Sequence, residues 1–372
     1  MPTTKPDLEF DSNQVCSGCI NFENRKNIDW DKREKEFVKI IQKFKNNGSN
    51  WDCIIPVSGG KDSTYQVIKV LSYGLNPLCV TGTTCDQSDL GYRNLQNIRE
   101  LGVDHLQVSF NPKIRRIINK TALKLVGDIS WPEHIAIFTV PIRVAVQYNV
   151  PLIVWGENSQ NEYGGPLEKS NNKFLDRSWL EEFGGLLGLR VSDLVGVEGI
   201  KKKDLLNYTY PDFKEIQKTN IQSIFLGHFF KWDGLTNAII SQAYGFESFS
   251  NNVENSMANY ENLDNHQTGI HDYFKYLKFG FGRTTDIVCN HIRRGRITRK
   301  DGFEIIKKLD GKFPWIYLGK RIEDILKPLD ISLIEFIKIC DKFTNKNIFK
   351  KNNRNELLKD KDGNLSLITN YE

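Results

Sequence analysis

The segment SGGKDS at residues 58–63 constrains the fold of this chain more than any other feature. It follows the apolar run WDCIIPV at 51–57, which is typical of a short buried strand, and it opens a helical stretch. In such a strand–loop–helix unit, the backbone N–H groups and the positive end of the helix converge on one point. Gly59 and Gly60 let the backbone approach an anion closely. The sequence therefore predicts a phosphate-binding loop.

Side chains of this loop supply further groups for an anion. The hydroxyls of Ser58 and Ser63 are hydrogen-bond donors, and Lys61 supplies a positive charge. The segment is not a Walker A loop, because that motif requires G-x-x-x-x-G-K-[ST], whereas Asp62 follows the lysine here and Ile55 occupies the first glycine position. A Gly/Ser turn without a ligand is the alternative, and the strand–loop–helix setting disfavours it.

The chain around this loop alternates between strand-like and helical patterns. Apolar runs at 78–82, 105–110 and 150–157 are typical of buried strands, and helical stretches separate them. Strands that alternate with helices indicate an α/β fold with a doubly wound parallel sheet. We place this domain at residues 31–240.

The flanking regions differ from this domain. Residues 1–30 have little hydrophobic periodicity and contain a single CxxC pair. In residues 241–372 the strand signals fade, and two capping boxes, which begin at Thr298 and Ser332, precede apolar helical stretches. We therefore expect a separate N-terminal CxxC segment and a mainly helical C-terminal region.

Composition excludes several classes of protein. With 372 residues, of which 39% are hydrophobic and 26% charged, the chain is long enough to bury a core without disulfides. The apolar region 136–155 is interrupted by Pro141 and Arg143, so it does not predict a membrane span. No apolar leader opens the sequence, which predicts a soluble, cytoplasmic protein. The net charge of +5 is mild, and it fits an anionic small substrate as well as a polyanionic partner.

A second glycine-rich segment, WGENSQNEYGG, follows the fourth predicted strand at 155–165. Ligands of open α/β sheets lie beyond the carboxyl ends of the strands, so we expect this segment to face SGGKDS. Gly156 is then a candidate for contact with a nucleotide. Glu157 and Glu162 are candidates for holding Mg²⁺ or a substrate hydroxyl. For either acid alone, a solvated position on the connection is the alternative.

A third group of candidates lies in the helical region, within residues 269–302. The segment KFGFGR places glycines between Lys278 and Arg283. Guanidinium geometry suits carboxylate or phosphate, so these cations are candidates for binding an anionic substrate. A basic helical surface in contact with water is the other interpretation.

Taken together, these segments resemble a known family. SGGKDS resembles the PP-loop of the ATP pyrophosphatase superfamily. The EYGG and KFGFGR segments, with MPTTKPDLEFD, CSGC and IRRGRITRKDG, resemble the N-acetyl sugar amidotransferases. These enzymes form acetamidino groups on lipopolysaccharide and flagellin-glycan sugars. The resemblance covers nearly the whole chain and implies a PP-loop type of sheet, similar to the adenine nucleotide alpha hydrolases.

The resemblance also implies a reaction and a set of site residues. ATP, with Mg²⁺, adenylylates the acetamide oxygen of a sugar, and ammonia then displaces AMP to leave an acetamidine. By the same resemblance, the catalytic residues are Lys61, Asp62 and Glu157. The nucleotide contacts are Ser58, Gly59, Gly60, Lys61, Asp62, Ser63 and Gly156, and the sugar contacts are Glu162, Lys278 and Arg283.

The proposed reaction consumes ammonia, so it requires a partner that supplies it. No Cys-His-Glu unit of a glutaminase is evident in the sequence. The resemblance implies a class I glutaminase like that of the histidine pathway, together with a cyclase-like channel subunit. The substrate is a small-molecule sugar that carries a carboxylate, either nucleotide-linked or similar to sialic acid. Neither nucleic acid nor a membrane is expected as a partner.

Zinc is a further cofactor that the resemblance implies, with Cys16 and Cys19 as ligands. Family members carry another CxxC just before the MPxT segment, which here begins at Met1. Structural zinc takes four ligands. Either the start lies further upstream, or the site is incomplete, or another residue such as a distant histidine completes it.

Two other functions compete with the amidotransferase. A PP-loop enzyme that modifies tRNA, by thiolation or lysidine synthesis, would use the basic C-terminal tail for RNA phosphates. The sequence shows no RNA-binding domain and no paired sulfur-carrying cysteines in the catalytic region. A non-catalytic nucleotide-binding subunit would bind ATP without releasing pyrophosphate.

Overall fold

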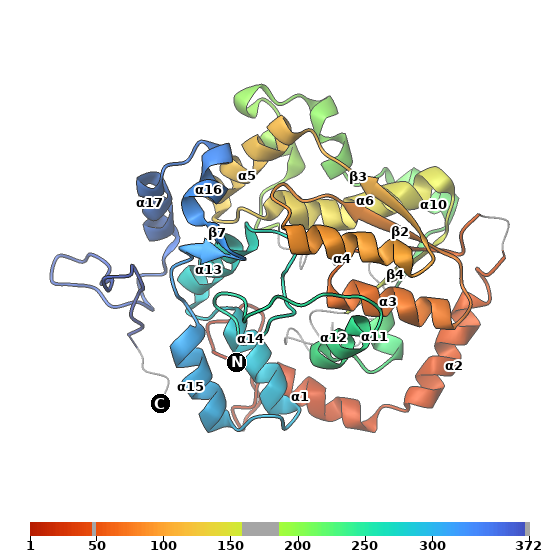
Figure 1. The fold of residues 1–372 in the computed structure, drawn as a ribbon, viewed down its shortest axis with the longest axis horizontal. Helices are drawn as coiled ribbons and strands as arrows, with labels where there is room; N and C mark the ends of the chain where they lie inside the picture. The colour runs from red at the N-terminus through yellow and green to blue at the C-terminus, as the bar shows by residue number, and fades with distance from the viewer. Residues whose placement is uncertain (47–49, 158–185, 369–372) are drawn as a thin grey trace.

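A five-stranded parallel sheet forms the centre of the computed structural model, which describes residues 1–46, 50–157 and 186–368 (Figure 1). The spatial order is β3-β2-β1-β4-β5, and every neighbouring pair is parallel. The strands are β1 (Cys53–Pro56), β2 (Pro77–Gly82), β3 (Asp104–Val108), β4 (Leu152–Trp155) and β5 (Gln222–Phe225). The predicted α/β fold with a doubly wound parallel sheet is confirmed.

Apolar side chains alternate between the two faces of this sheet. On β1, Cys53 and Ile55 face one core, while Ile54 faces the other. The first core is completed by α2 (Trp30–Ile41), α3 (Lys61–Ser72), α4 (Asp89–Glu100) and α11 (Leu226–Phe229). The second is completed by α6 (Trp131–Tyr148) and α10 (Phe213–Thr219). Helices therefore bury both faces of the sheet.

The strand order determines where a ligand can bind. β1 and β4 are neighbours, paired at Ile54 and Ile153, although β2 and β3 lie between them in the sequence. The chain leaves β1 toward one side of the sheet and enters β4 from the other side, so a topological switch point lies between them. The loops after β1 and β4 therefore leave the same edge of the sheet side by side.

Two elements of this domain differ from the sequence-based expectation. β5 was not among the predicted strands, because its four residues QSIF run directly into the short helix α11. α6 was not predicted either, because it contains Pro141, a residue that normally ends a helix. Both elements are held by tertiary packing, since β5 pairs with β4, and α6 covers β1, β2 and β4.

The remaining elements lie outside the sheet. α1 (Ser17–Asn24) and a 3-10 turn (Arg25–Asn27) precede α2, and α5 (Pro112–Val126) packs against α6. Before β5 come the 3-10 turns Val191–Leu194, Val197–Gly199 and Lys202–Tyr208, and after it comes α12 (Gly234–Gln242). The C-terminal elements are α13 (Thr268–Phe279), α14 (Arg283–Arg293), α15 (Arg299–Leu309), β6 (Ile316–Tyr317), β7 (Lys320–Arg321), α16 (Ile322–Leu326), a 3-10 turn (Lys327–Leu329) and α17 (Leu333–Phe343).

The C-terminal helices begin where their capping residues predict. The side chain of Thr298 accepts a hydrogen bond from the backbone N–H of Asp301 at the start of α15. Ser332 accepts one from the N–H of Glu335 at the start of α17. Among the described helices, none combines the length and the apolar composition that crossing a membrane requires.

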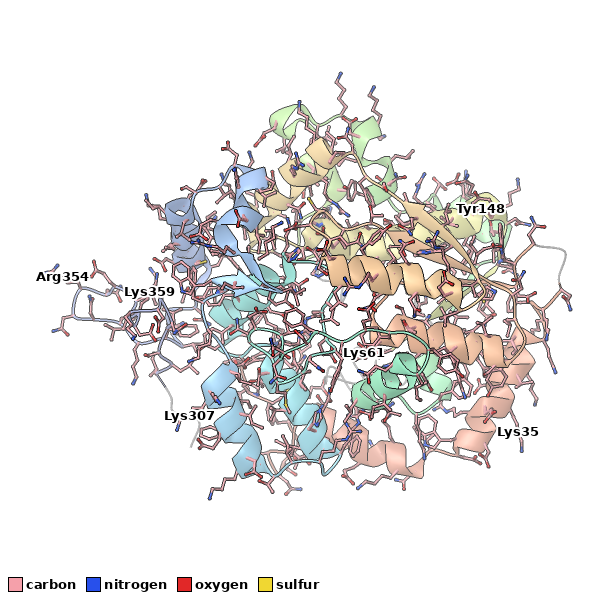
Figure 2. All side chains as sticks on the ribbon, in the orientation of Figure 1. Lys35, Lys61, Tyr148, Lys307, Arg354 and Lys359 are labelled. Carbon is pink, nitrogen blue, oxygen red and sulfur yellow. The ribbon has the colours of Figure 1, made fainter. Side chains whose placement is uncertain are left out.

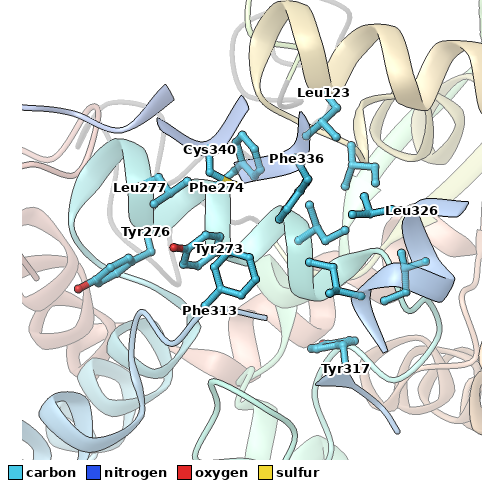
Figure 3. Close-up of a cluster of buried hydrophobic side chains, with 14 of the residues drawn as sticks. Leu123, Tyr273, Phe274, Tyr276, Leu277, Phe313, Tyr317, Leu326, Phe336 and Cys340 are labelled. Carbon is cyan, nitrogen blue, oxygen red and sulfur yellow. The ribbon is translucent and has the colours of Figure 1, made fainter. Parts of the chain in front are cut away.

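An aromatic core holds these helices together (Figure 3). Phe336 of α17 contacts Phe274 of α13 and also Phe313, with ring centroids 6.0 Å apart in each pair. The same cluster includes Leu123 of α5. The helical region is therefore packed directly against the sheet domain.

Replacing Phe336 by alanine should lower the free energy of unfolding by about 3–5 kcal/mol, because it removes a fully buried ring and leaves a cavity. Ile334 lies on the same helix and is 70% exposed, so Ile334→Ala should change stability by less than about 0.5 kcal/mol. Urea unfolding of both variants measures the difference. Equal effects would contradict the packing of α17 described here.

Candidate functional site

The loop after β1 curls around its own side chains. The hydroxyl of Ser63 donates to the carbonyl of Gly60 at 3.0 Å, and the N–H of Ser58 donates to the Ser63 hydroxyl at 3.3 Å. The Ser58 hydroxyl accepts from the N–H of Gly60 at 3.3 Å. Gly60 is the N-cap of α3. The loop therefore forms a closed turn at the positive end of a helix, an arrangement that binds anions.

Gly59 is required by the shape of this turn. Its φ of +82° lies in the left-handed region, and a Cβ there would come within 2.6 Å of the backbone nitrogen of Leu95 in α4. Only glycine combines this conformation with so close an approach. The glycine therefore lets the loop pack directly against α4.

Lys61 is buried at the start of α3, near the centre of the molecule (Figure 2). Its ammonium group lies 2.6 Å from a carboxylate oxygen of Asp62 and 2.9 Å from one of Glu261. Burial alone lowers the pKa of this lysine, but the two carboxylates outweigh it and raise the pKa above its ordinary value. Lys61 therefore remains charged at neutral pH.

Asp62 and the backbone of Lys61 are held by α12. The side-chain amide of Asn237 donates to Asp62 at 2.8 Å, and the hydroxyl of Ser241 donates to the carbonyl of Lys61 at 2.7 Å. Both partners come from one face of α12, one turn apart. α12 therefore fixes the first turn of α3, which carries the two charged residues.

A segment that precedes α13 forms the opposite wall. The N–H of Ser88 donates to the carbonyl of Asp264 at 3.0 Å, and its hydroxyl donates to the carbonyl of Leu263. Gly91, in the first turn of α4, lies against the backbone of Asp264 where a larger residue would clash. Burial raises the pKa of Asp264, and the nearby Glu133 adds to this effect. The first turn of α4 therefore holds this segment in place through hydrogen bonds and close backbone packing.

These three parts enclose one pocket. It is lined by the loop 58–63, by Gly91 and Asn94 of α4, and by residues 260–264. Polar groups dominate the lining. They are the ammonium of Lys61, several hydroxyls, the N–H groups of a helix start and the carboxyl groups of Asp62, Glu261 and Asp264. The pocket therefore suits a polar ligand rather than an apolar one.

The segment after β4 is described only at its start. Gly156 accepts a hydrogen bond from the N–H of Gly227 at 3.0 Å, and a Cβ there would lie 3.2 Å from atoms of Gln66 and Trp232. Glu157 is half-buried at the same edge of the sheet as the loop 58–63. Glu162 lies outside the described residues. The proposed contacts of these residues with nucleotide, magnesium or sugar stay predictions.

The structure gives protein partners to the two cations of KFGFGR. The ammonium of Lys278 donates to the carbonyls of Val126 and Gly127 at 2.8 and 3.0 Å. Arg283 forms a two-pronged ion pair with Asp272 at 2.9 and 3.2 Å. Asp272 also accepts a hydrogen bond, 3.3 Å long, from the side-chain amide of Asn262, and Asn262 lines the pocket. Lys278 and Arg283 themselves are not in the pocket lining, so their contact with a sugar stays a prediction.

Cys16 and Cys19 lie at the start of α1, with their sulfur atoms 3.5 Å apart. The hydrogen bond between them lowers the pKa of Cys16, and Arg293 favours its thiolate as well. Among the described residues, no third histidine, cysteine or acid comes close enough to share a metal ion with this pair. The described residues therefore do not form a four-ligand zinc site, and zinc binding by this pair stays a prediction.

The sequence does not predict the pocket residues Glu261 and Asp264, nor Asn237, which contacts the pocket residue Asp62 from α12. Glu261 and Asp264 stand in the polar run NYENLDNH, and Asn237 stands in an amphipathic helix. Neither pattern signals a site by itself. Their roles depend on contacts across long stretches of sequence, with Lys61, Ser88 and Asp62.

Three comparisons with known proteins gave matches. Residues 247–361 match the family model of the C-terminal domain of WbpG-like LPS biosynthesis proteins. An uncharacterized protein of Methanocaldococcus jannaschii is 33% identical over 79 residues, which are 21% of this chain. The chain spans 28% of that relative's length. The structure of NMN synthetase from Francisella tularensis aligns over 60% of this chain and 99% of that one, with 14% identity and a TM-score of 0.27.

The family match bears directly on the pocket. Its residues 247–361 include the wall at 260–264 and the helices α13 to α17, whereas the loop 58–63 lies outside it. One wall of the pocket is thus the loop 58–63, and the other lies in the region that matches the C-terminal domain of WbpG-like LPS biosynthesis proteins. The chain therefore combines both features at a single site.

Replacing Gly59 by alanine should destabilise the protein more than the same change at Gly102. Both glycines have a positive φ, which costs an alanine about 1–2 kcal/mol, but only Gly59 lies against backbone atoms. We expect the clash with Leu95 to lower the free energy of unfolding of Gly59→Ala by roughly another 1–3 kcal/mol. Chemical denaturation measures both free energies, and equal losses would contradict the close approach of loop and α4.

Proposed function

We propose that this protein is an ATP-dependent amidotransferase that converts an N-acetyl group of a sugar to an acetamidino group in surface polysaccharide or LPS biosynthesis. The observation that carries this proposal is the pocket itself. A loop of PP-loop sequence faces a segment that matches a domain of LPS biosynthesis proteins. ATP as a substrate makes the cytoplasm the expected location.

The loop 58–63 fits the pyrophosphate part of ATP. Its N–H groups converge at the start of α3, and Gly59 leaves no side chain in the turn. Lys61 adds a positive charge that burial would otherwise suppress. In our proposal, Asp62 and Glu157 hold Mg²⁺ with the nucleotide, because carboxylates are the protein ligands that this ion prefers.

The reaction needs activation because an acetamide carbonyl is a poor electrophile. We propose that the acetamide oxygen attacks the α-phosphorus of ATP and that pyrophosphate leaves. Ammonia then attacks the carbon of the adenylylated imidate, and AMP leaves with the former acetamide oxygen. We propose that Lys61 acts on the departing pyrophosphate, where a fixed positive charge would stabilise the growing negative charge and lower the barrier.

The sugar is proposed to carry a carboxylate and to lie beside the nucleotide. Glu162, Lys278 and Arg283 are its proposed contacts. Because Lys278 is held by two carbonyls and Arg283 by Asp272, a sugar would bind these cations only by sharing or replacing those partners. A separate glutaminase, with a channel subunit, is the proposed source of ammonia.

Asp62→Ala and Ser58→Ala should each lower the rate of pyrophosphate release by at least about 100-fold, because both residues shape the loop that holds the leaving group. Ser72→Ala is the matched control, since this serine ends the same helix and bonds only to the carbonyl of Lys69. The assay contains ATP, Mg²⁺, ammonium and a panel of carboxylated N-acetyl sugars. Normal turnover by the loop variants would refute the assignment of this site.

The nucleotide product should be AMP and not ADP, because the loop is proposed to hold the leaving pyrophosphate rather than direct cleavage to the γ-phosphate. Chromatography of the reaction mixture separates the two, and mass spectrometry detects the replacement of oxygen by an imino group in the sugar. Glutamine alone should not replace ammonium. Formation of ADP and orthophosphate would contradict the proposed chemistry, and AMP formation stimulated by tRNA instead of a sugar would favour a tRNA-modifying enzyme.

A further inference from the structure

A second group of chemically active side chains lies outside the pocket lining. Asp128 stands in the turn between α5 and α6, His134 in the first turn of α6, and His271 in the first turn of α13. We propose that these three residues bind one divalent transition-metal ion, with Zn²⁺ as the preferred candidate. This site is separate from the Mg²⁺ that accompanies ATP and from the cysteine pair of α1.

The geometry of the three residues supports a shared ion. The two carboxylate oxygens of Asp128 lie 2.8 Å from Nδ1 of His271 and 3.2 Å from Nδ1 of His134. One ligand atom from each residue lies within 4.8 Å of the other two. Ligands that share a zinc ion lie roughly 3–3.5 Å apart, given bond lengths of about 2.0–2.1 Å. A small rotation of the imidazoles therefore brings all three atoms onto one ion.

The three side chains differ in their exposure to solvent. The side chain of Asp128 is 4% exposed, whereas those of His134 and His271 are 23% and 26% exposed. An ion held here would keep contact with solvent on the histidine side. Three protein ligands and an open position are the arrangement of catalytic rather than structural zinc.

Surrounding contacts hold the ligands in place. Asp128 accepts a hydrogen bond from the N–H of Ser130 at 2.9 Å. The ammonium of Lys278 binds the carbonyls of Val126 and Gly127, which fixes the turn just before Asp128. Such outer contacts orient metal ligands and tune their affinity. Lys278, predicted from the sequence as a sugar contact, thus supports this turn in the structure.

The donor set indicates the kind of ion. Two imidazoles and one carboxylate suit Zn²⁺ and neighbouring first-row ions, whereas Mg²⁺ and Ca²⁺ prefer oxygen ligands. Asp272, which follows His271 in α13, contacts the pocket residue Asn262. The helix that carries His271 is thus also in contact with the pocket.

The test uses the full chain without a histidine tag and with Cys16→Ser and Cys19→Ser, so that the cysteine pair of α1 cannot bind the metal. After treatment with a chelator, the protein is dialysed against Zn²⁺, and bound metal is measured by mass spectrometry. We expect about one ion per chain and a higher unfolding temperature with Zn²⁺ than without it. His271→Ala and Asp128→Asn should each lose most of the bound ion.

His266→Ala is the matched control, because His266 is also a partly buried histidine paired with an aspartate, Asp86. It should retain the ion. If the His271 and Asp128 variants fold poorly, Co²⁺ bound to the parent protein decides the question through its visible absorption. Imidazole and carboxylate ligands give d–d bands without the near-ultraviolet thiolate band.

Three results would overturn the proposal. The first is no metal bound by the parent protein, which would leave a hydrogen-bonded cluster that only stabilises the fold. The second is equal metal content in the parent and in His271→Ala. The third is a cobalt spectrum of the protein with its cysteines intact that shows thiolate ligands alone. None of these results depends on the amidotransferase assay, so the two proposals fail separately.

Discussion

The buried ammonium group of Lys61 connects the two regions on which the site depends. It belongs to the loop after β1, and its partner Glu261 belongs to the segment before α13. The carboxylate of Asp62 pairs with the same ammonium group. The two carboxylates thus compensate a buried positive charge that would be costly if it were unpaired. Removing one partner of such a buried pair typically costs about 3–5 kcal/mol. The charge cluster is therefore one of the contacts that hold loop and segment together around the pocket.

Additional contacts along α4 extend the same connection. The side chain of Asn94 exchanges two hydrogen bonds with the backbone of Glu247, at 2.7 and 2.9 Å, and Ser88 binds the backbone at Leu263 and Asp264. The C-terminal region is thus attached at both ends of residues 247–264. Because Gly59 also packs against α4, this one helix contacts both the loop 58–63 and the opposite wall of the pocket.

The cations of α13 and α14 show how charge serves structure next to the site. Arg283 is paired with Asp272, and Lys278 with two backbone carbonyls. Arg283 thereby holds Asp272, the residue next to His271. Lys278 holds the turn before Asp128. Basic residues that the sequence marks as ligand contacts therefore also build the framework around the proposed metal site. The aromatic core behind them, with Phe274 and Phe336, keeps α13 in position.

Local signals in the sequence were sufficient for part of this picture. The loop SGGKDS, four of the five sheet strands and the caps at Thr298 and Ser332 were predicted, because each depends on residues that are neighbours in the chain. The parallel, doubly wound arrangement followed from the alternation of strands and helices.

Tertiary structure decided the rest. β5 is only four residues long, and it forms because it pairs with β4. α6 contains an internal proline, and it is stabilised because it packs on the sheet. Glu261 and the cluster of Asp128, His134 and His271 come together only when distant segments fold against each other. No local pattern encodes such a meeting, because the distance between side chains depends on the path of the whole chain between them.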